Sequence, residues 1–189
     1  MLNILKEHIE QVLKLDEKEF DSIVPFFKTE KFRKRQFVIQ ENQPVLKIYF
    51  VCKGLLKSGF MDDIGKEHIL QFACKNWWIS DFTAFFKQEN STLAIDCIED
   101  SELLSISFDN LNKICAEVPK MEHFFRVKSN FGYISLQQRI LSMMKDSAKD
   151  RYEIFCNQYP TIIEKVPKQL IANYLGVSRE TLSRLYQPK

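Results

Sequence analysis

The stretch V-P-K-Q-L-I-A-N-Y-L-G-V-S-R-E-T-L-S-R-L, residues 166–185, decides the fold of the C-terminal part of this chain. Apolar residues recur at helical spacing on both sides of Gly176, as Leu170, Ile171, Tyr174 and Leu175 before it and Leu182 and Leu185 after it. Pro167 suits the first turn of a helix, where its missing N–H costs nothing. Gly176 ends that helix, because glycine accepts left-handed backbone, and Ser178 is a favourable N-cap for the next one. Two short helices joined by a tight turn form a helix-turn-helix.

The second of these helices has one polar and one apolar side. At about 100° per residue, four polar side chains fall within an arc of about 140°, namely Arg179, Glu180, Ser183 and Arg184. Arginine can donate two hydrogen bonds to guanine, and glutamate can accept one from cytosine. The alternative is an ordinary solvated helix with a Glu180–Arg184 ion pair. The apolar residues available for packing on the first helix favour DNA recognition.

Three further residues of this stretch are candidates for DNA contact. Lys168 and Gln169 stand near the start of the first helix, and Ser178 stands at the start of the second. We expect Lys168 to face a phosphate, because lysine contacts to the DNA backbone position a protein without reading sequence.

The segment S-R-E-T-L-S-R, residues 178–184, resembles the recognition helix of the Crp/Fnr superfamily, the catabolite-activator type of bacterial transcription regulator. In that family, the positions matching Arg179, Glu180 and Arg184 contact bases, and Ser183 matches a base-contacting serine of the Fnr branch. The resemblance covers nearly the whole chain, and it makes RNA polymerase a further candidate partner. Two features depart from the family pattern. Residues 161–166 are too few for the β-hairpin wing that precedes this motif, and only four residues follow Leu185.

Composition narrows the class of protein. The 189 residues include 45% hydrophobic residues and 16 Phe, which predicts one large or two small domains with an aromatic-rich core. A net charge of +2 excludes a uniformly basic nucleic-acid coat, whereas residues 165–189 hold five basic residues and one acidic residue. Five scattered cysteines without a C-x-x-C predict reduced thiols in a cytoplasm and no metal site.

Two further classes of protein find no support in the sequence. No apolar run reaches the ~20 residues that span a bilayer, and the charged residues near the N-terminus do not fit a signal peptide. No nucleophile–base pair, phosphate-binding loop or metal motif indicates an enzyme. The iron–sulfur branch of the Crp/Fnr family carries a cysteine cluster near its N-terminus, whereas the first cysteine here is Cys52. No cofactor is identified.

Residues 31–107 change to short β-rich runs separated by turn residues. Strands are expected at Gln36–Gln40, Lys47–Cys52, Leu55–Met61, His68–Phe72, Leu93–Ile98 and Glu102–Ile106. So many short strands predict a small sandwich, roll or barrel. The resemblance specifies an antiparallel β-roll (a double-stranded β-helix) that holds a cyclic nucleotide in its best-known members. One or two short helices precede it in residues 1–28, with Asp16 as an N-cap and Glu19 as its capping-box partner.

Four residues correspond to the family's phosphate-binding segment. By resemblance, Asp81 takes the place of a ribose-binding glutamate and Ser80 replaces a glycine. Ser91 falls where an arginine should be, and Thr92 follows it. These four are the candidate ligand-binding residues, and the ligand would be an unknown small-molecule effector.

The chain lacks the cation that a cyclic nucleotide needs. A buried phosphodiester is costly unless it is paired, and an arginine fork pairs it best. No arginine occurs between Arg35 and Arg126. We therefore predict that the roll does not bind cAMP or cGMP tightly.

The spacing of apolar residues in 118–145 predicts one long helix with two apolar stripes. The first follows 3-4-3 spacing and is typical of a coiled-coil seam, at Phe124, Val127, Phe131, Ile134 and Leu141. The second can cover the β-roll, at Met121, Phe125, Leu136, Ile140 and Met143. A central helix buried within one subunit is the alternative. Two stripes need two partners, and each recognition helix reads only a few base pairs, so a homodimer on palindromic double-stranded DNA is favoured.

These features together predict an α+β chain in three parts. Residues 1–117 form the sensor β-roll with N-terminal helices, residues 118–145 the dimerisation helix, and residues 146–189 a helix-turn-helix domain, winged-helix-like with its wing reduced or absent. The function favoured is a dimeric, sequence-specific bacterial transcription regulator. The alternative is a cyclic-nucleotide-binding-like ligand-sensing or protein-interaction module without specific DNA binding. The polar outer face of residues 178–185 argues against that alternative.

Overall fold

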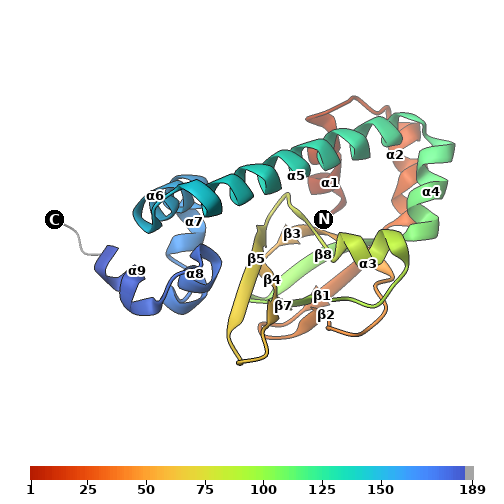
Figure 1. Ribbon diagram of the computed structural model, residues 1–189. Helices are drawn as coiled ribbons and strands as arrows, with labels where there is room; N and C mark the ends of the chain where they lie inside the picture. Colours follow the sequence, from red (N-terminus) through yellow and green to blue (C-terminus); the bar gives the residue numbers. More distant parts are fainter. Residues whose placement is uncertain (186–189) are drawn as a thin grey trace. The chain divides into compact units, whose positions relative to one another are not determined.

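The computed structural model describes residues 1–185, which form two compact units (Figure 1). The first unit comprises Met1–Phe60 and Gln71–Ser129, and the second comprises Met61–Leu70 and Asn130–Lys189. The last four residues of the predicted DNA-binding domain, 186–189, lie outside the described residues. Helix α5 (Lys120–Lys145) runs from the first unit into the second.

The roll consists of two four-stranded sheets. One has the strand order β1 (Lys28–Phe32), β8 (Ser101–Ser107), β3 (Lys47–Lys53) and β6 (Trp78–Ile79), and the other β2 (Phe37–Ile39), β7 (Ala94–Cys97), β4 (Leu55–Met61) and β5 (Glu67–Cys74). Strands β3 and β8 pair antiparallel, from Lys47 opposite Ser107 to Lys53 opposite Glu102. All six expected strands are present. The sequence missed β1, whose charged residues hide its alternation, and β6, which has only two residues.

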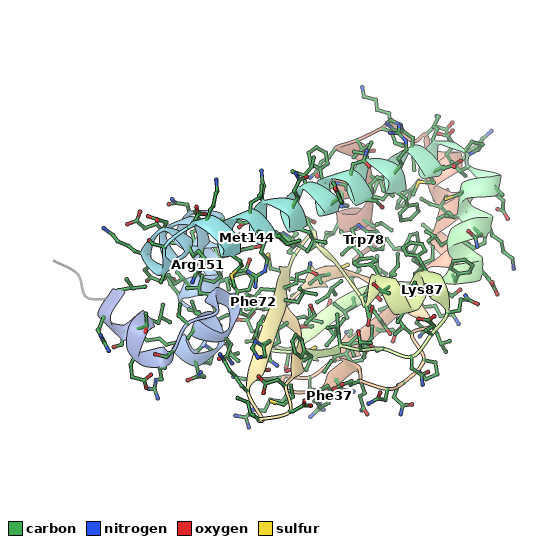
Figure 2. The ribbon with its side chains drawn as sticks, in the orientation of Figure 1. Phe37, Phe72, Trp78, Lys87, Met144 and Arg151 are labelled. Atoms are coloured by element: carbon green, nitrogen blue, oxygen red, sulfur yellow. The ribbon has the colours of Figure 1, made fainter. Side chains whose placement is uncertain are left out.

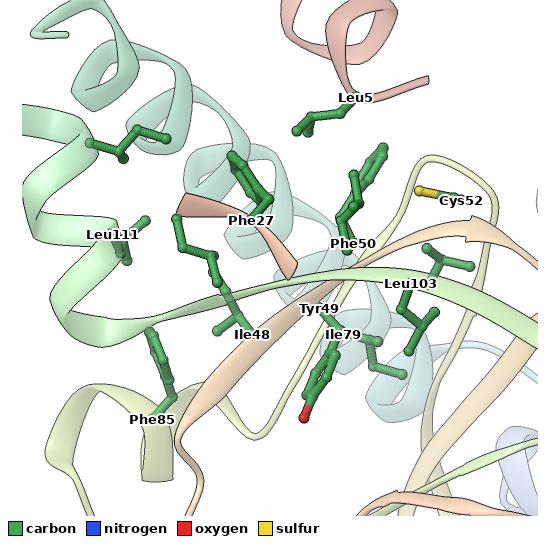
Figure 3. Packing of buried hydrophobic residues seen from close by; sticks show 14 of the residues in the cluster. Leu5, Phe27, Ile48, Tyr49, Phe50, Cys52, Ile79, Phe85, Leu103 and Leu111 are labelled. Atoms are coloured by element: carbon green, nitrogen blue, oxygen red, sulfur yellow. The ribbon is translucent and has the colours of Figure 1, made fainter. Parts of the chain in front are cut away.

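The outer face of the β3 sheet is covered by helices. Strand alternation sends Phe50 to this face and Tyr49 to the opposite one, as Figure 3 shows. The covering helices are α1 (Leu2–Glu10), α2 (Glu17–Ile23), α4 (Phe108–Glu117) and the start of α5. The predicted capping box of α2 is confirmed, since Asp16 and Glu19 exchange hydrogen bonds of 2.9 Å each. The sequence left α4 unassigned, although Ser107 caps it by accepting from the N–H of Asn110.

Helix α5 begins in the core of the first unit, which corrects the predicted stripes. Phe124 was expected in the dimer seam but is fully buried, and so is Met121. Residues 121, 124 and 125 share one face at i, i+3 and i+4, so the prediction divided a single buried face between two stripes. The rest of the expected roll-facing stripe is exposed, namely Leu136, Ile140 and Met143.

Between α5 and Leu185, the last described residue, the second unit contains four more helices. They are α6 (Ala148–Gln158), α7 (Pro160–Ile163), α8 (Lys168–Leu175) and α9 (Arg179–Leu185). Their buried side chains are Phe155, Tyr159, Ile162, Val166, Ile171, Ala172, Asn173, Tyr174, Leu175 and Leu182. Only Asp146 and Ser147 separate α5 from α6, at the predicted boundary between the dimerisation helix and the DNA-binding part. Ser147 forms a capping box with Asp150. Up to Leu185, the segment where a wing would lie contains α7 and a turn instead of a hairpin.

No helix within residues 1–185 combines the length and the apolar character that crossing a bilayer requires.

His8 of α1 is buried in this core between two aromatic rings. Its ring centroid lies 4.9 Å from that of Phe50 and 5.8 Å from that of Phe124. Neither ring nitrogen has a hydrogen-bond partner. Burial, and then the positive charge of Lys128, lower the pKa of His8 to about 4. The folded protein therefore keeps this imidazole neutral at physiological pH.

The neutral His8 predicts a loss of stability in mild acid. Its pKa is about 6.5 in the unfolded chain and about 4 in the folded one, so unfolding takes up a proton below pH 6.5. The free energy of unfolding should fall between pH 6.5 and pH 4, by on the order of 3 kcal/mol at the lower end. In urea titrations across this pH range, the free energy of unfolding of His8→Phe should fall much less than that of the wild type. The exposed His123→Phe serves as control, and an unchanged pH slope in His8→Phe would contradict this account.

Candidate nucleic-acid interface and ligand pocket

Helices α8 and α9 form the helix-turn-helix that the sequence predicts. Gly176 ends α8 in the left-handed conformation, with φ +68°, and Val177 N donates to Ala172 O at 3.0 Å. Ser178 Oγ accepts from Thr181 N at 3.1 Å, which caps α9. Pro167 differs slightly from its expected place, because it is the N-cap of α8 and not part of its first turn.

The two sides of α9 are divided as expected. Its exposed side chains are Arg179, Glu180, Ser183 and Arg184, whereas Leu182 is fully buried and Thr181 and Leu185 are half-buried. Glu180 has a lowered pKa, first because its own backbone amide and the Ser178 hydroxyl bond its carboxylate, and then because of the charges of Arg179 and Arg184. The face therefore presents two guanidinium groups and one ionised acceptor.

The start of α8 is exposed at both predicted DNA-contact positions, Lys168 and Gln169. Gln169 is also bonded within the chain, since its Nε2 donates to Asn173 Oδ1 at 2.9 Å. Asn173 in turn donates to Glu67 Oε2 of β5 at 3.3 Å. Sequence reasoning missed this chain of polar contacts, because Glu67 and Asn173 are far apart in sequence.

Beyond Phe124, α5 presents a long apolar surface. The exposed side chains are Phe131, Tyr133, Ile134, Leu136, Ile140, Leu141, Met143 and Met144, with Val127 half-buried. Met144 is 80% exposed, which is far beyond what a core position shows. A contiguous apolar surface of this kind marks an interaction site.

The predicted ligand residues of the roll lie together, but most of them bond one another. Asp81 caps α3 (Phe82–Lys87) by accepting from Ala84 N at 3.0 Å. Its other oxygen accepts from Ser91 Oγ at 3.1 Å, Thr92 N at 3.0 Å and Thr92 Oγ1 at 3.2 Å. Ser80 instead donates to the backbone carbonyl of Lys47. Asp81 is only 2% exposed, and in this structure its carboxylate is occupied by hydrogen bonds from the protein itself.

The Asp81 carboxylate remains ionised in this setting. Burial raises its pKa, but the hydrogen bonds from the amides of Ala84 and Thr92 and the hydroxyls of Ser91 and Thr92 outweigh that effect, and the net shift is downward. A side chain of the protein is therefore the anion that these donors bind.

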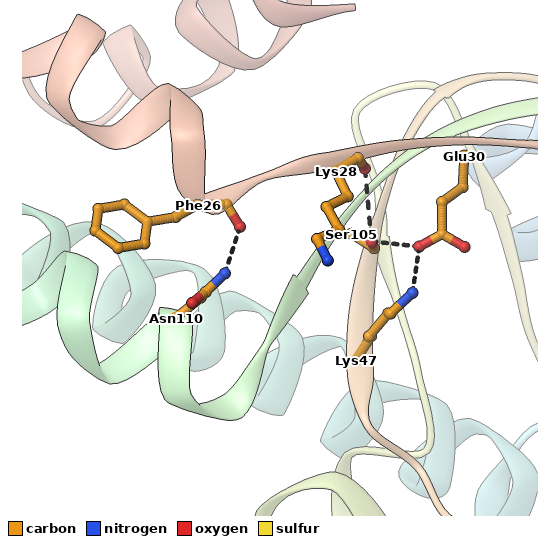
Figure 4. A network of polar contacts seen from close by, with 6 residues as sticks. All are labelled: Phe26, Lys28, Glu30, Lys47, Ser105 and Asn110. Carbon is orange, nitrogen blue, oxygen red and sulfur yellow. Dashed lines mark hydrogen bonds and ion pairs between the residues drawn. The ribbon is translucent and has the colours of Figure 1, made fainter.

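A cavity of about 310 Å³ opens elsewhere in the roll, along β2 and the start of β3. Its lining includes Phe37, Ile39, Gln43, Val45, Lys47 and Tyr49, and none of the four predicted ligand residues. Lys47 is already paired, because its Nζ lies 2.8 Å from Glu30 Oε1, an oxygen that also accepts from Ser105 (Figure 4). The cavity thus has a mixed apolar and polar lining, and its one lysine is already ion-paired.

Comparison with known proteins agrees with this fold. Residues 29–118 match the model of the cyclic nucleotide-binding domain. The chain is 28% identical to the regulatory protein HlyX of Actinobacillus pleuropneumoniae over 165 residues, which cover 81% of this chain and 68% of that protein. It is 25% identical to the anaerobic regulatory protein of Pasteurella multocida over 184 residues, which cover 90% of this chain and 66% of that protein. The chain thus spans about two thirds of the length of these relatives.

Two solved structures share the fold at low sequence identity. FixK2 from Bradyrhizobium japonicum aligns with a TM-score of 0.73 and 17% identity, over 84% of this chain and 82% of that one. The c-di-GMP-responsive global regulator CLP of Xanthomonas campestris aligns with a TM-score of 0.73 and 16% identity, over 90% and 89%. In its fold, its domain match and its relatives, the chain is therefore similar to transcription regulators of the Crp/Fnr type, and residues 29–118 carry their cyclic nucleotide-binding domain.

Proposed function

We propose that this chain is a dimeric, sequence-specific DNA-binding transcription regulator whose roll works without a tightly bound cyclic nucleotide. One observation carries the proposal. The polar side chains of α9 are exposed together, on a helix-turn-helix whose apolar residues are buried. A module that served only protein packing would have no need to keep two arginines and an ionised glutamate on the outer face of that helix.

The exposed face of α9 supplies the base readers. Arg179 and Arg184 would bind guanine edges in the major groove, and Glu180 would accept from cytosine. Ser183 lies on the same face, and Ser178 begins the helix. Lys168 at the start of α8 would bind a phosphate, which fixes orientation without reading sequence.

The exposed part of α5 supplies the dimer surface. We place Val127, Phe131, Ile134 and Leu141 in the seam and leave out Phe124, which is buried in the first unit. In a two-fold dimer, two copies of α9 would read a palindrome with half-sites about 34–36 Å apart. The sensor, dimerisation and DNA-binding parts remain at 1–117, 118–145 and 146–189. RNA polymerase is a candidate further partner, and five scattered cysteines without a C-x-x-C fit a reducing cytoplasm.

The Asp81 cluster supports a roll that does not need a cyclic nucleotide. A phosphate entering this segment would have to compete with a buried carboxylate for the donors of Ser91 and Thr92. Two like charges at one site repel each other, and no arginine occurs between Arg35 and Arg126 to offset that repulsion. An effector of another kind has the cavity beside Tyr49 available to it.

The first prediction from this proposal concerns cyclic nucleotides. Titration calorimetry of the intact protein with cAMP, and separately with cGMP, should show no binding in the low-micromolar range. The reason is the anion already present at Asp81. A low-micromolar dissociation constant for either nucleotide would show that the cluster opens and that its interpretation is wrong.

A second prediction concerns dimerisation. Phe131→Glu combined with Ile134→Glu should give a monomer in sedimentation equilibrium and weaken DNA binding strongly, because two buried charges would face each other across the seam. The control is Ile64→Glu, which places the same charge on a side chain that is 87% exposed in another part of the chain. A wild-type protein that is already monomeric at micromolar concentration would remove the basis for the seam.

The third prediction separates base reading from backbone contact. Selection from random duplexes should yield a palindrome. On that site Arg184→Ala should cost about 1–3 kcal/mol and relax the preference at one base pair in each half-site. Lys168→Ala should weaken binding to all DNA sequences alike and make the affinity less dependent on salt concentration.

The control for both variants is Arg126→Ala, which removes an exposed charge from the first unit. If no palindrome emerges, or if Arg184→Ala and Lys168→Ala lose equal affinity on every sequence, α9 does not read bases. The chain would then be an interaction module without specific DNA binding.

A further inference from the structure

An arginine of the second unit contacts the C-terminal end of α8. It is not one of the proposed base readers, so its role needs a separate explanation. Arg139 of α5 donates through Nη2 to the carbonyl of Tyr174 at 2.8 Å and to the carbonyl of Ile69 at 3.0 Å. Its guanidinium carbon also lies 3.6 Å from the centroid of the Tyr174 ring. One side chain therefore connects three elements of this unit, namely α5, β5 and α8.

A second arginine acts at the neighbouring carbonyl. Arg151 of α6, labelled in Figure 2, donates through Nε to Leu175 O at 3.1 Å and through Nη1 to Asp146 O at 2.7 Å. The last carbonyls of a helix lack helical partners and carry the negative end of its dipole, so cations are favoured there. Arg139 and Arg151 together satisfy the end of α8 immediately before the turn into α9.

Two further contacts fix the same turn. Met143 lies one helical turn after Arg139, and a Cβ added to Gly176 would come within 2.8 Å of its Cε. On the other side of α8, Asn173 donates to Glu67 of β5. The helix-turn-helix is thus attached to α5 and to the tip of the β4–β5 hairpin at several points, all within the second unit.

We propose that Arg139 is a positioning residue for DNA reading, in that it fixes where the helix-turn-helix is attached to the dimerisation helix. This inference rests on the proposed function. In a two-fold dimer built on α5, the distance between the two copies of α9 depends on how firmly each α8 is held on its own α5. The half-site spacing that the dimer accepts is therefore set at Arg139.

The base-reading surface does not depend on this attachment. The packing of α9 on α8 is local, because it comes from the buried Leu182, the left-handed Gly176 and the Ser178 cap. Arg139 is half-buried, and its contacts are a tyrosine ring and two carbonyls of the chain itself. Loss of Arg139 should loosen the attachment and leave the preference within each half-site unchanged.

The test measures spacing discrimination. Full-length wild type, Arg139→Gln and Arg139→Lys are bound to the selected palindrome, to versions with its half-sites moved one base pair closer or farther apart, and to a duplex with a single half-site. Arg126→Gln is the matched control, because it removes the same charge from an exposed position of the same helix. Thermal unfolding of each variant shows whether it is folded.

Arg139→Gln should bind the palindrome about tenfold more weakly, within the usual range of coupling between sites, and should discriminate less between spacings. Its affinity for the single half-site and the salt dependence should match those of the wild type, and so should all properties of Arg126→Gln. The palindrome affinity and spacing discrimination of Arg139→Lys should lie between those of the wild type and Arg139→Gln. An ammonium can donate to carbonyls but lacks the flat face that stacks on Tyr174. Tyr174→Leu, a second variant, removes the stacking ring but also its contacts with Phe155 and Tyr159, so it is compared only at temperatures where thermal unfolding shows it folded. It should relax spacing discrimination in the same direction.

Two results would overturn the inference while the proposed function stands. One is undiminished spacing discrimination in a folded Arg139→Gln. The other is an equal loss of affinity on the palindrome and the single half-site, which would mean that Arg139 supports the fold of the helix-turn-helix itself. A wild type that selects no palindrome would instead overturn the proposed function, and this inference with it.

Discussion

The burial of one face at the start of α5 is the constraint on which the rest of the structure depends. Met121 and Phe124 are fully removed from solvent among α1, α4 and the β3 sheet. Replacing a buried aromatic side chain of this size by alanine typically costs about 3–5 kcal/mol, so this end of α5 is firmly held in the first unit. The remaining turns of the helix keep their apolar residues exposed. The proposed dimer surface depends on this, because the buried face is confined to one end of the helix.

Charges that are buried or half-buried in this protein, such as Asp81 and Arg139, are satisfied mainly by the backbone and by short polar side chains. Asp81 receives two amide and two hydroxyl hydrogen bonds, and Arg139 donates to two carbonyls while stacking on a ring. A buried charge without such partners would be strongly unfavourable. Both groups therefore fix local geometry, Asp81 between α3 and the Ser91–Thr92 turn, and Arg139 at the end of α8. His8 is the contrasting case, because it has no partner and stays neutral.

The relation between the roll and its ligand follows from the same electrostatics. A domain that matches the cyclic nucleotide-binding domain normally has to provide donors for a phosphate. In this chain the equivalent donors of Thr92 and Ser91 bind a carboxylate that is covalently part of the protein. The proposed function therefore does not require a nucleotide at this cluster, and the cavity along β2 and β3 has none of the four predicted ligand residues in its lining.

The sequence by itself determined the local elements. Gly176 and Ser178 specify the turn and cap of the helix-turn-helix, the Asp16–Glu19 pair specifies the start of α2, and alternation specifies six strands. Each of these signals lies within a few residues, where backbone preference and side-chain capping act. The polar face of α9 was predictable for the same reason, since helical periodicity alone assigns Arg179 and Arg184 to one side.

Only the tertiary structure decided which surfaces are covered and which groups meet. The burial of Phe124 and the exposure of Leu136 depend on where α5 leaves its neighbours, and periodicity is the same in both cases. The pairing of Asp81 with Ser91 and Thr92, and of Arg139 with Ile69 and Tyr174, joins residues that are distant in the chain. Hydrogen bonds and ring contacts act over a few ångströms of space, so a linear pattern cannot show them until the chain has folded.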